Sequence, residues 1–174
     1  MIDTDRLFAK TREIPIFSPL TDEELQSLLL QCQIALYLKD KVIFRESALG
    51  DSMMVVLQGS VSLRCSPEQG VTVEVAQLGE GAILGEMAVI DPAPRAATAV
   101  ATSNAVLLVM QKEVLDRLLT SDHPLASKVM RQVLLLLAAR FRTMEDRIEQ
   151  LFVSRIGERP AGSPAAAWAI APME

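Results

Sequence analysis

Seven short runs of β-favouring residues, separated by glycine, proline and small polar residues, fill the sequence from Ile34 to about Met110. The runs are ALYL, KVIF, MMVVLQG, SVSLRC, VTVEVAQL, AATAVA and AVLLVM, and they recur about every ten residues. Glycine turns a strand sharply without steric cost, and glycines lie at or near the corners between the runs: Gly50, Gly59, Gly70, Gly79, Gly81 and Gly85. This spacing predicts a sandwich, a small barrel or a tight β-roll.

Helical signals flank this β region. Before it, Thr21 and Glu24 stand three residues apart ahead of an apolar stripe, which is the pattern of a capping box at a helix start. After it, residues 111–155 have helical periodicity: a short amphipathic helix ends before Pro124 and a long helix follows. The fold class is therefore predicted as α+β, mainly β, with helices at both ends.

The long helix carries apolar residues spaced alternately by four and three positions, here called the heptad seam: Met130, Leu134, Leu137, Phe141, Met144, Ile148 and Leu151. A period of about 3.5 residues is what two supercoiling helices require. Arg140 and Glu145 then occupy positions that pair between parallel helices. A second stripe, Val129, Val133 and Leu136, suits packing against the same chain. We predict a homodimer through the seam, with a helix packed wholly on its own domain as the alternative.

The charge balance and the apolar content restrict the function classes. The chain has 17 basic and 22 acidic residues and a net charge of −5, whereas domains that grip nucleic acid backbone are usually strongly basic. No apolar stretch is longer than that of residues 133–139, which is far shorter than the roughly 20 residues of a membrane helix. The N-terminus MIDTDRLFAK lacks a signal-peptide pattern. We therefore expect a soluble, cytoplasmic protein.

The cysteine and histidine content argues against metal and histidine chemistry. Cys32 and Cys65 have no metal-ligand spacing and are predicted to be reduced packing residues. A single histidine disfavours a zinc site, a histidine-dependent triad and a cupin-like metal enzyme. We predict no catalytic residue, no metal and no catalytic cofactor.

The stretch GEMAVIDPAPRAAT, residues 85–98, places the base Arg95 nine residues after the acid Glu86, among small and apolar neighbours. Arg95 offers a planar fork of donors suited to a phosphate or carboxylate. Glu86, when ionised, only accepts hydrogen bonds and could hold a ligand hydroxyl. Gly85 allows close approach, and a helical turn over EMAVI would add free N–H groups. These features describe a sugar phosphate or nucleotide site, and a surface salt bridge between Glu86 and Arg95 is the alternative.

The same stretch resembles the phosphate-binding cassette of the cyclic nucleotide-binding domain family, whose pattern is roughly F-G-E-L-A-L, a few residues, then P-R-A-A-T. The matching residues are Gly85, Glu86, Ala88, Pro94, Arg95, Ala96, Ala97 and Thr98. Upstream, GDSMMVVLQGSV and LGEGAILGE are similar to the family's G-D corner and to its approach to the cassette. The departures are Leu84 for Phe and Met87 for Leu, which both keep an apolar wall.

This resemblance covers about residues 10–152 and implies a domain organisation. Residues 1–13 would be an N-terminal extension and 14–152 a cyclic nucleotide-binding domain. Its β-roll, a double-stranded β-helix of jelly-roll type, would span about 34–110, with C-terminal helices over about 111–155. Residues 156–174 would be a flexible tail rich in Ala, Pro and Gly. The relatives are sensor domains of catabolite activators and of kinase regulatory subunits, and this chain resembles a stand-alone bacterial-type module.

The resemblance also implies a role for each cassette residue. Arg95 would pair with the cyclic phosphate, helped by backbone N–H groups near Ala88 and Ala96, and Glu86 would accept from the ribose 2'-hydroxyl. Relatives that prefer cyclic GMP often carry Thr where this chain has Ala96, so cyclic AMP is the expected ligand. The full predicted contact set is Gly85, Glu86, Met87, Ala88, Arg95, Ala96 and Ala97, with Leu84 and Thr98 as pocket wall and Thr143 as base cap.

The predicted function is a cyclic nucleotide sensor that repositions its C-terminal helix and so regulates its own dimer or an effector protein. About twenty residues follow the long helix, so no DNA-binding domain is expected. The alternatives are a dimeric scaffold with an unused pocket and a transcription-regulator relative without its DNA-binding domain.

Overall fold

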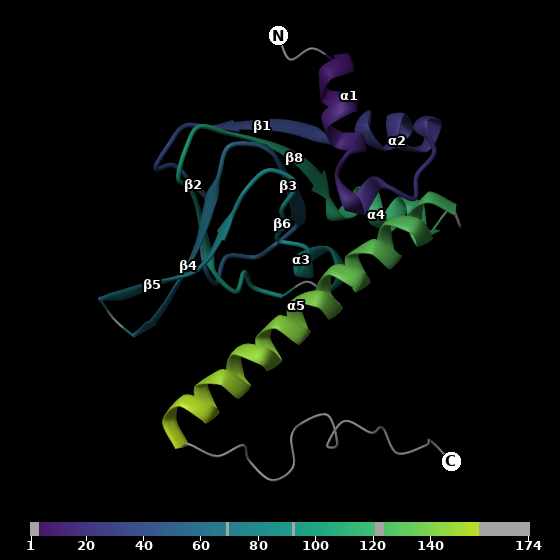
Figure 1. Cartoon of the computed structure of the whole chain (residues 1–174). Coiled ribbons are helices and arrows are strands. Elements are labelled where there is room, and N and C mark those ends of the chain that lie inside the picture. The colour runs from purple at the N-terminus through teal and green to yellow at the C-terminus, as the bar shows by residue number, and fades with distance from the viewer. Residues whose placement is uncertain (1–3, 69, 92, 121–123, 157–174) are drawn as a thin grey trace, which may run out of the picture. The chain divides into compact units, whose positions relative to one another are not determined.

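The structure is a computed structural model that describes residues 4–68, 70–91, 93–120 and 124–156 (Figure 1). It divides into two compact units, the first ending at Val133 and the second beginning at Leu134. The first unit holds every strand of the described chain and carries the predicted cassette. The predicted tail lies outside the described residues from position 157 onward.

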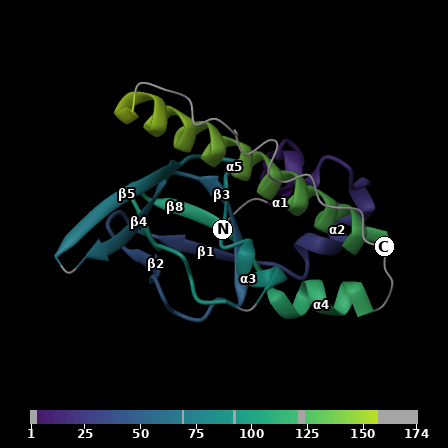
Figure 2. The same cartoon turned by 90° about the horizontal axis from the view of Figure 1, so that it is seen from below.

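Two antiparallel four-stranded sheets form the β part of the first unit (Figures 1 and 2). The first has the order β1 (Gln33–Tyr37), β8 (Ala105–Gln111), β3 (Ser52–Gln58) and β6 (Ile83–Leu84). The second has the order β2 (Val42–Phe44), β7 (Thr98–Ala101), β4 (Val61–Glu68) and β5 (Val71–Leu78). The mainly β fold with helices at both ends is confirmed. Each predicted β run corresponds to a strand, and β6 was not predicted because two residues carry no periodicity.

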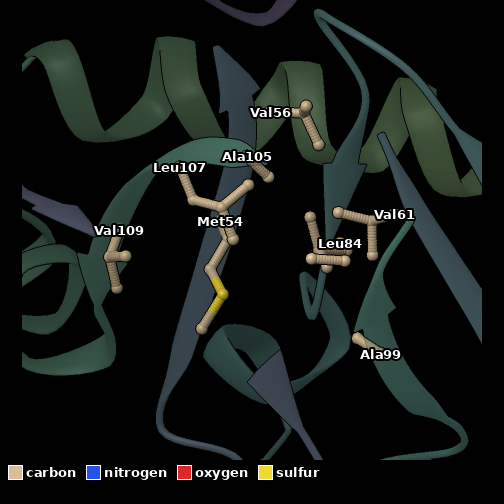
Figure 3. Close-up of a cluster of buried hydrophobic side chains, with 9 residues drawn as sticks. Met54, Val56, Val61, Leu84, Ala99, Ala105, Leu107 and Val109 are labelled. Carbon is tan, nitrogen blue, oxygen red and sulfur yellow. The ribbon is translucent and has the colours of Figure 1, made fainter. Parts of the chain in front are cut away.

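The hydrophobic core contains side chains from both sheets (Figure 3). The cluster consists of Met54, Val56, Val61, Leu84, Ala99, Ala101, Ala105, Leu107 and Val109. Val61 pairs with Ala101 across β4 and β7, and Met54 pairs with Val109 across β3 and β8. The core therefore lies between the two sheets, and it fixes the strands from which the cassette departs.

The helices of the first unit include the one predicted from its capping box. Thr21 caps α2 (Asp22–Leu29): its hydroxyl accepts from the Glu24 N–H at 3.2 Å, and Glu24 accepts from the Thr21 N–H at 2.8 Å. The other elements are α1 (Thr4–Arg12), the 3-10 turn η1 (Pro15–Phe17), α3 (Met87–Ile90) and α4 (Lys112–Thr120). The long helix α5 (Pro124–Ile156) begins in the first unit.

Helix α1 lies in the segment that the sequence predicted only as an extension. Lys10 Nζ donates to the Leu57 carbonyl at 3.1 Å and pairs with Glu80 at 3.4 Å. Thr11 is fully buried, and its hydroxyl donates to the Leu7 carbonyl. These contacts join α1 to β3 and to the corner before β6. The Lys10 contacts hold this helix against the rest of the first unit.

Helix α5 has the two apolar stripes that its sequence predicts. Val129 and Val133 are fully buried, and Leu136 is half-buried. Most of the heptad seam is exposed, by 42% to 60% of the side chain, at Leu134, Phe141, Met144, Ile148 and Leu151. Met130 and Leu137 are half-buried. The pairing of the seam with a second chain stays a prediction.

The described part of the chain contains no helix that is both long and apolar enough to cross a membrane. Both cysteines are free thiols, as predicted. Burial raises the pKa of the Cys32 thiol to about 12, so this side chain is protonated near neutral pH. Cys65 lies in β4, where its Sγ donates to the Ala96 carbonyl at 3.3 Å.

Candidate ligand-binding site

The predicted cassette runs from the end of β6 through α3 to the start of β7. A loop between β2 and β3 holds its second half. The Arg95 N–H donates to the Ala48 carbonyl at 2.8 Å, and the Ser47 N–H donates to the Arg95 carbonyl at 2.9 Å. Leu49 and Pro94 form an isolated antiparallel bridge. The backbone on either side of Arg95 is therefore fixed by a segment about 45 residues earlier in the sequence.

Arg95 points into the protein, and only 7% of it is exposed. Its Nη1 donates to the Gly85 carbonyl at 3.0 Å, and its Nη2 donates to the Ser52 hydroxyl at 3.2 Å. The guanidinium carbon lies 4.4 Å from the centre of the Phe44 ring, a cation–π contact. The Arg95 Nε is buried and has no hydrogen-bond partner. Because buried polar groups in native proteins are nearly always paired, this donor requires an explanation.

The site holds a buried arginine with two carboxylates nearby. Burial lowers the pKa of the Arg95 guanidinium, and the nearby charges of Asp51 and Glu86 raise it in part. Arginine nevertheless stays protonated in proteins. Glu86 is only 3% exposed. The alternative of a surface salt bridge between Glu86 and Arg95 is therefore wrong, because both side chains are buried.

Two glycines make room for the guanidinium. Gly85 has φ +72°, and a Cβ there would lie 2.3 Å from Arg95 Nη1. A Cβ at Gly50 would lie 2.5 Å from the Ala88 Cβ and 3.0 Å from Arg95 Nε. The shortest distance at each glycine, 2.3 Å at Gly85 and 2.5 Å at Gly50, is too short for a real Cβ atom. The bare position 85 therefore leaves room for the guanidinium, and the bare position 50 lets the loop before β3 pack against Ala88 beside it.

The short helix α3 forms at the predicted turn over EMAVI. Ala88 is buried, whereas Met87 is 57% exposed. The Ala88 N–H donates to the Gly85 carbonyl at a long 3.3 Å. Within the parts of the chain that the structure describes, no group accepts a hydrogen bond from the Ala96 N–H. These two N–H groups are the backbone donors that the resemblance assigned to a phosphate.

The remaining predicted site residues lie in different surroundings. Ala97 is half-buried, and Leu84 belongs to the hydrophobic core. The Thr98 hydroxyl accepts from the Glu46 N–H at 3.0 Å. Thr143 lies on α5 in the second unit, where it is exposed and its hydroxyl donates to the Ala139 carbonyl at 3.1 Å. The roles of Leu84, Thr98 and Thr143 toward a ligand stay predictions.

Sequence reasoning missed the partners that hold Arg95. Gly50 and Asp51 were recognised as part of a corner motif, but no pattern connected that corner with the cassette. Phe44 and Ser52 lie 51 and 43 positions before Arg95, and a single sequence carries no signal for contacts at such separation. The described residues contain no cluster of three His, Cys, Asp or Glu side chains that could hold a metal.

A family model described as cyclic nucleotide-binding domain matches residues 35–122 of the chain. The chain is similar to the cyclic AMP receptor protein of Thermus thermophilus, with 33% identity over 123 residues, or 68% of this chain and 57% of that protein. It is also similar to a cAMP-dependent protein kinase regulatory subunit of Blastocladiella emersonii, with 34% identity over 48% of this chain and 20% of that one. The chain thus spans little more than half of the length of the receptor protein.

Solved structures show the same architecture. A cyclic nucleotide-binding domain from Methylobacillus flagellatus matches with a TM-score of 0.73 and 31% identity, covering 83% of this chain and 81% of that one. The regulatory domain of Toxoplasma gondii PKA, solved with cAMP, matches with a TM-score of 0.63 and 21% identity over 74% of this chain and 50% of that one. At this lower identity the likeness shows the fold alone.

Proposed function

Because the chain belongs to the cyclic nucleotide-binding domain family, we propose that it is a sensor module that binds cyclic AMP at Arg95. The observation that carries this proposal is the state of the arginine. A buried guanidinium is held by two neutral groups, the Gly85 carbonyl and the Ser52 hydroxyl, and its Nε has no partner. An anionic ligand at Arg95 would supply the missing acceptor through a charge-assisted hydrogen bond.

A cyclic nucleotide suits the groups that surround the arginine. The backbone N–H groups of Ala88 and Ala96 would bind the cyclic phosphate together with Arg95, and Glu86 would accept from the ribose 2'-hydroxyl. Gly85 allows close approach of the ligand, and Met87 and Ala97 complete the proposed contact set. Glu86 is buried, and its charge acts on Arg95, so a ligand whose phosphate is bound by the arginine would bring its ribose close to this carboxylate.

The preference for cyclic AMP rests on Ala96 and on the relatives. An alanine there offers no hydroxyl to the guanine amino group, so cyclic GMP would gain nothing over cyclic AMP. The similar protein from Thermus thermophilus is named a cyclic AMP receptor protein. Cyclic AMP is therefore the proposed ligand and cyclic GMP the weaker one.

The proposed output is a change in the C-terminal helix and in a homodimer that forms through the heptad seam. A ligand shifts such an equilibrium only by its different affinity for the two states. The exposed seam favours dimerisation, and it equally favours the second candidate function, a dimeric scaffold whose pocket stays empty. The effector protein that would receive the signal is a partner of unknown identity.

Titration calorimetry of the whole chain with cyclic AMP and cyclic GMP tests the proposal. We expect cyclic AMP to bind more tightly. Replacing Arg95 with Ala should weaken binding by more than about a hundredfold, because two charge-assisted hydrogen bonds are lost. Arg12→Ala, which changes an arginine of α1 that bonds the Leu20 carbonyl and pairs with Asp22, is the matched control. Absence of binding of either nucleotide at millimolar concentration would favour the scaffold.

A further inference from the structure

Ser52, the first residue of β3, links a carboxylate to Arg95. Its hydroxyl donates to Asp51 Oδ1 at 3.0 Å and accepts from Arg95 Nη2 at 3.2 Å. Ser52 is only 4% exposed. A serine hydroxyl has one hydrogen, and here that hydrogen goes to Asp51. The oxygen lone pairs are therefore directed toward the guanidinium, and the charge of Asp51 strengthens the hydroxyl as an acceptor.

The backbone beside Ser52 is itself anchored. The Lys112 N–H, at the start of α4, donates to the Asp51 carbonyl at 2.7 Å. Ser52 pairs with Gln111 in the antiparallel ladder between β3 and β8. The hydroxyl that accepts from Arg95 thus stands on a fixed strand end rather than on a free loop.

The guanidinium is held at two of its three nitrogens. Ser52 holds Nη2 and the Gly85 carbonyl holds Nη1, while the Phe44 ring lies against the guanidinium. A planar group with two fixed points and a ring against it has one orientation. This orientation decides the direction in which Nε and the unused N–H bonds point. A donor set fixed before the ligand arrives loses less entropy on binding.

We propose that Ser52 is a positioning residue of the ligand site: its hydroxyl, bonded to Asp51, orients the Arg95 fork toward an exocyclic oxygen of the cyclic phosphate. This rests on the proposed function, in which Arg95 binds that phosphate. Ser52 would act through Arg95 and would not contact the nucleotide.

The chain offers a matched control for the test. Ser62, on β4, is also fully buried and also stands between a carboxylate and an arginine: its hydroxyl donates to Glu74 and accepts from Arg64 Nε at 3.0 Å. Ser62→Ala removes the same kind of link at a residue that pairs with Val100, beyond the cassette, and that makes no hydrogen bond to Arg95. It should lower stability about as much as Ser52→Ala and leave the affinity for cyclic AMP unchanged.

Calorimetry on the whole chain gives the first measurement. Ser52→Ala should weaken cyclic AMP binding about ten- to a hundredfold, the usual effect of losing one hydrogen bond to a charged group. Ser52→Thr keeps the hydroxyl and should restore affinity to within about twofold of the original chain. If Ser52→Ala fails to fold, Ser52→Cys, which keeps the shape but accepts hydrogen bonds weakly, takes its place.

The second measurement reports orientation rather than stability. Replacing either exocyclic oxygen of cyclic AMP with sulfur gives two diastereomers, and a fixed fork distinguishes them because it meets only one exocyclic atom directly. Their affinity ratio should be large in the original chain and in Ser62→Ala. In Ser52→Ala the affinity ratio should move toward one, because the guanidinium is then free to turn toward either exocyclic atom of the phosphate.

The outcomes separate the two proposals. If the original chain binds no cyclic nucleotide, the proposed function fails. If the original chain binds and Ser52→Ala binds equally well, the positioning role of Ser52 is overturned while the proposed function stands. A weaker Ser52→Ala with an unchanged diastereomer ratio also overturns it, because the hydroxyl would then support only the fold.

Discussion

At the scale of single residues, the site depends on positions that have no side chain. Gly85 has a left-handed backbone conformation. Arg95 Nη1 also lies close to the position that a Cβ atom of residue 85 would occupy. Gly81 has a similar φ of +80°, but no atom lies within 4 Å of its Cβ position. A substitution at Gly81 would therefore cause backbone strain alone, whereas a substitution at Gly85 would cause strain and also displace the arginine.

Gly85→Ala should lose both stability and ligand affinity. We expect a loss of about 1 to 2 kcal/mol in the free energy of unfolding from the left-handed φ. Cyclic AMP should in addition bind at least about tenfold more weakly, because the new methyl group displaces the guanidinium. Urea unfolding and calorimetry measure the two effects.

Gly81→Ala is the control for this prediction. It should lose a similar amount of stability and keep the affinity of the original chain, since no side chain has to move. Equal affinity losses in both variants would mean that the contact between Gly85 and Arg95 has no part in binding.

The sequence predicted the two charged ends of the site but not the residues that hold them. Glu86 and Arg95 stand in one local motif, and their residue types indicate hydroxyl and phosphate recognition. Ser52 and Phe44 reach Arg95 only through the packing of β3 and β2 against the cassette. Such contacts depend on tertiary structure, and the residue types alone do not indicate them.

At the scale of elements, α5 has one stripe that packs in its own chain and another that is exposed. The strands and α2 could be predicted because alternation and capping are local properties. The position of α1 could not, because it depends on Lys10 reaching Leu57 and Glu80 across the fold. The heptad seam is also a local pattern. The contact that it predicts is with a second copy of the chain, so the structure of one chain does not contain it.

Phe141→Glu tests the seam. Phe141 is 47% exposed, and in a dimer two copies of its ring would be buried. Burial of an aromatic side chain contributes about 1.5 to 3 kcal/mol, and two facing carboxylates would repel each other. Sedimentation velocity should show a dimer dissociation constant raised roughly a hundredfold or more.

Ala139→Glu introduces the same charge two positions earlier. In the predicted heptad this position faces away from the partner helix, and it is exposed in the structure. The variant should therefore dimerise like the original chain. A monomeric original chain, or an effect of equal size at both positions, would contradict the seam as the dimer contact.

At the scale of the whole molecule, the ligand and the folded state stabilise each other. A ligand that binds only the folded chain at a hundred times its dissociation constant adds about 2.7 kcal/mol. For a chain of this size, that corresponds to an increase in Tm of roughly 5 to 10 °C. Thermal unfolding with increasing cyclic AMP should show this shift.

Arg95→Met provides the contrast in the same measurement. Methionine fills much of the volume of the arginine without placing a charge and an unpaired donor in the interior. We expect a ligand-free Tm below that of the original chain, because the buried Glu86 carboxylate loses the positive charge near it, and no shift with cyclic AMP. A lower ligand-free Tm together with a normal ligand shift would show that Arg95 serves the fold and not the ligand.

The unpaired Nε of Arg95 has a consequence for the lifetime of the protein in a cell. A buried donor without an acceptor makes the empty protein less stable than the filled one. Proteases degrade chains mainly from the opened state, and the population of that state falls as stability rises. Empty molecules should therefore be degraded faster than filled ones, and the amount of this protein would follow the concentration of its ligand.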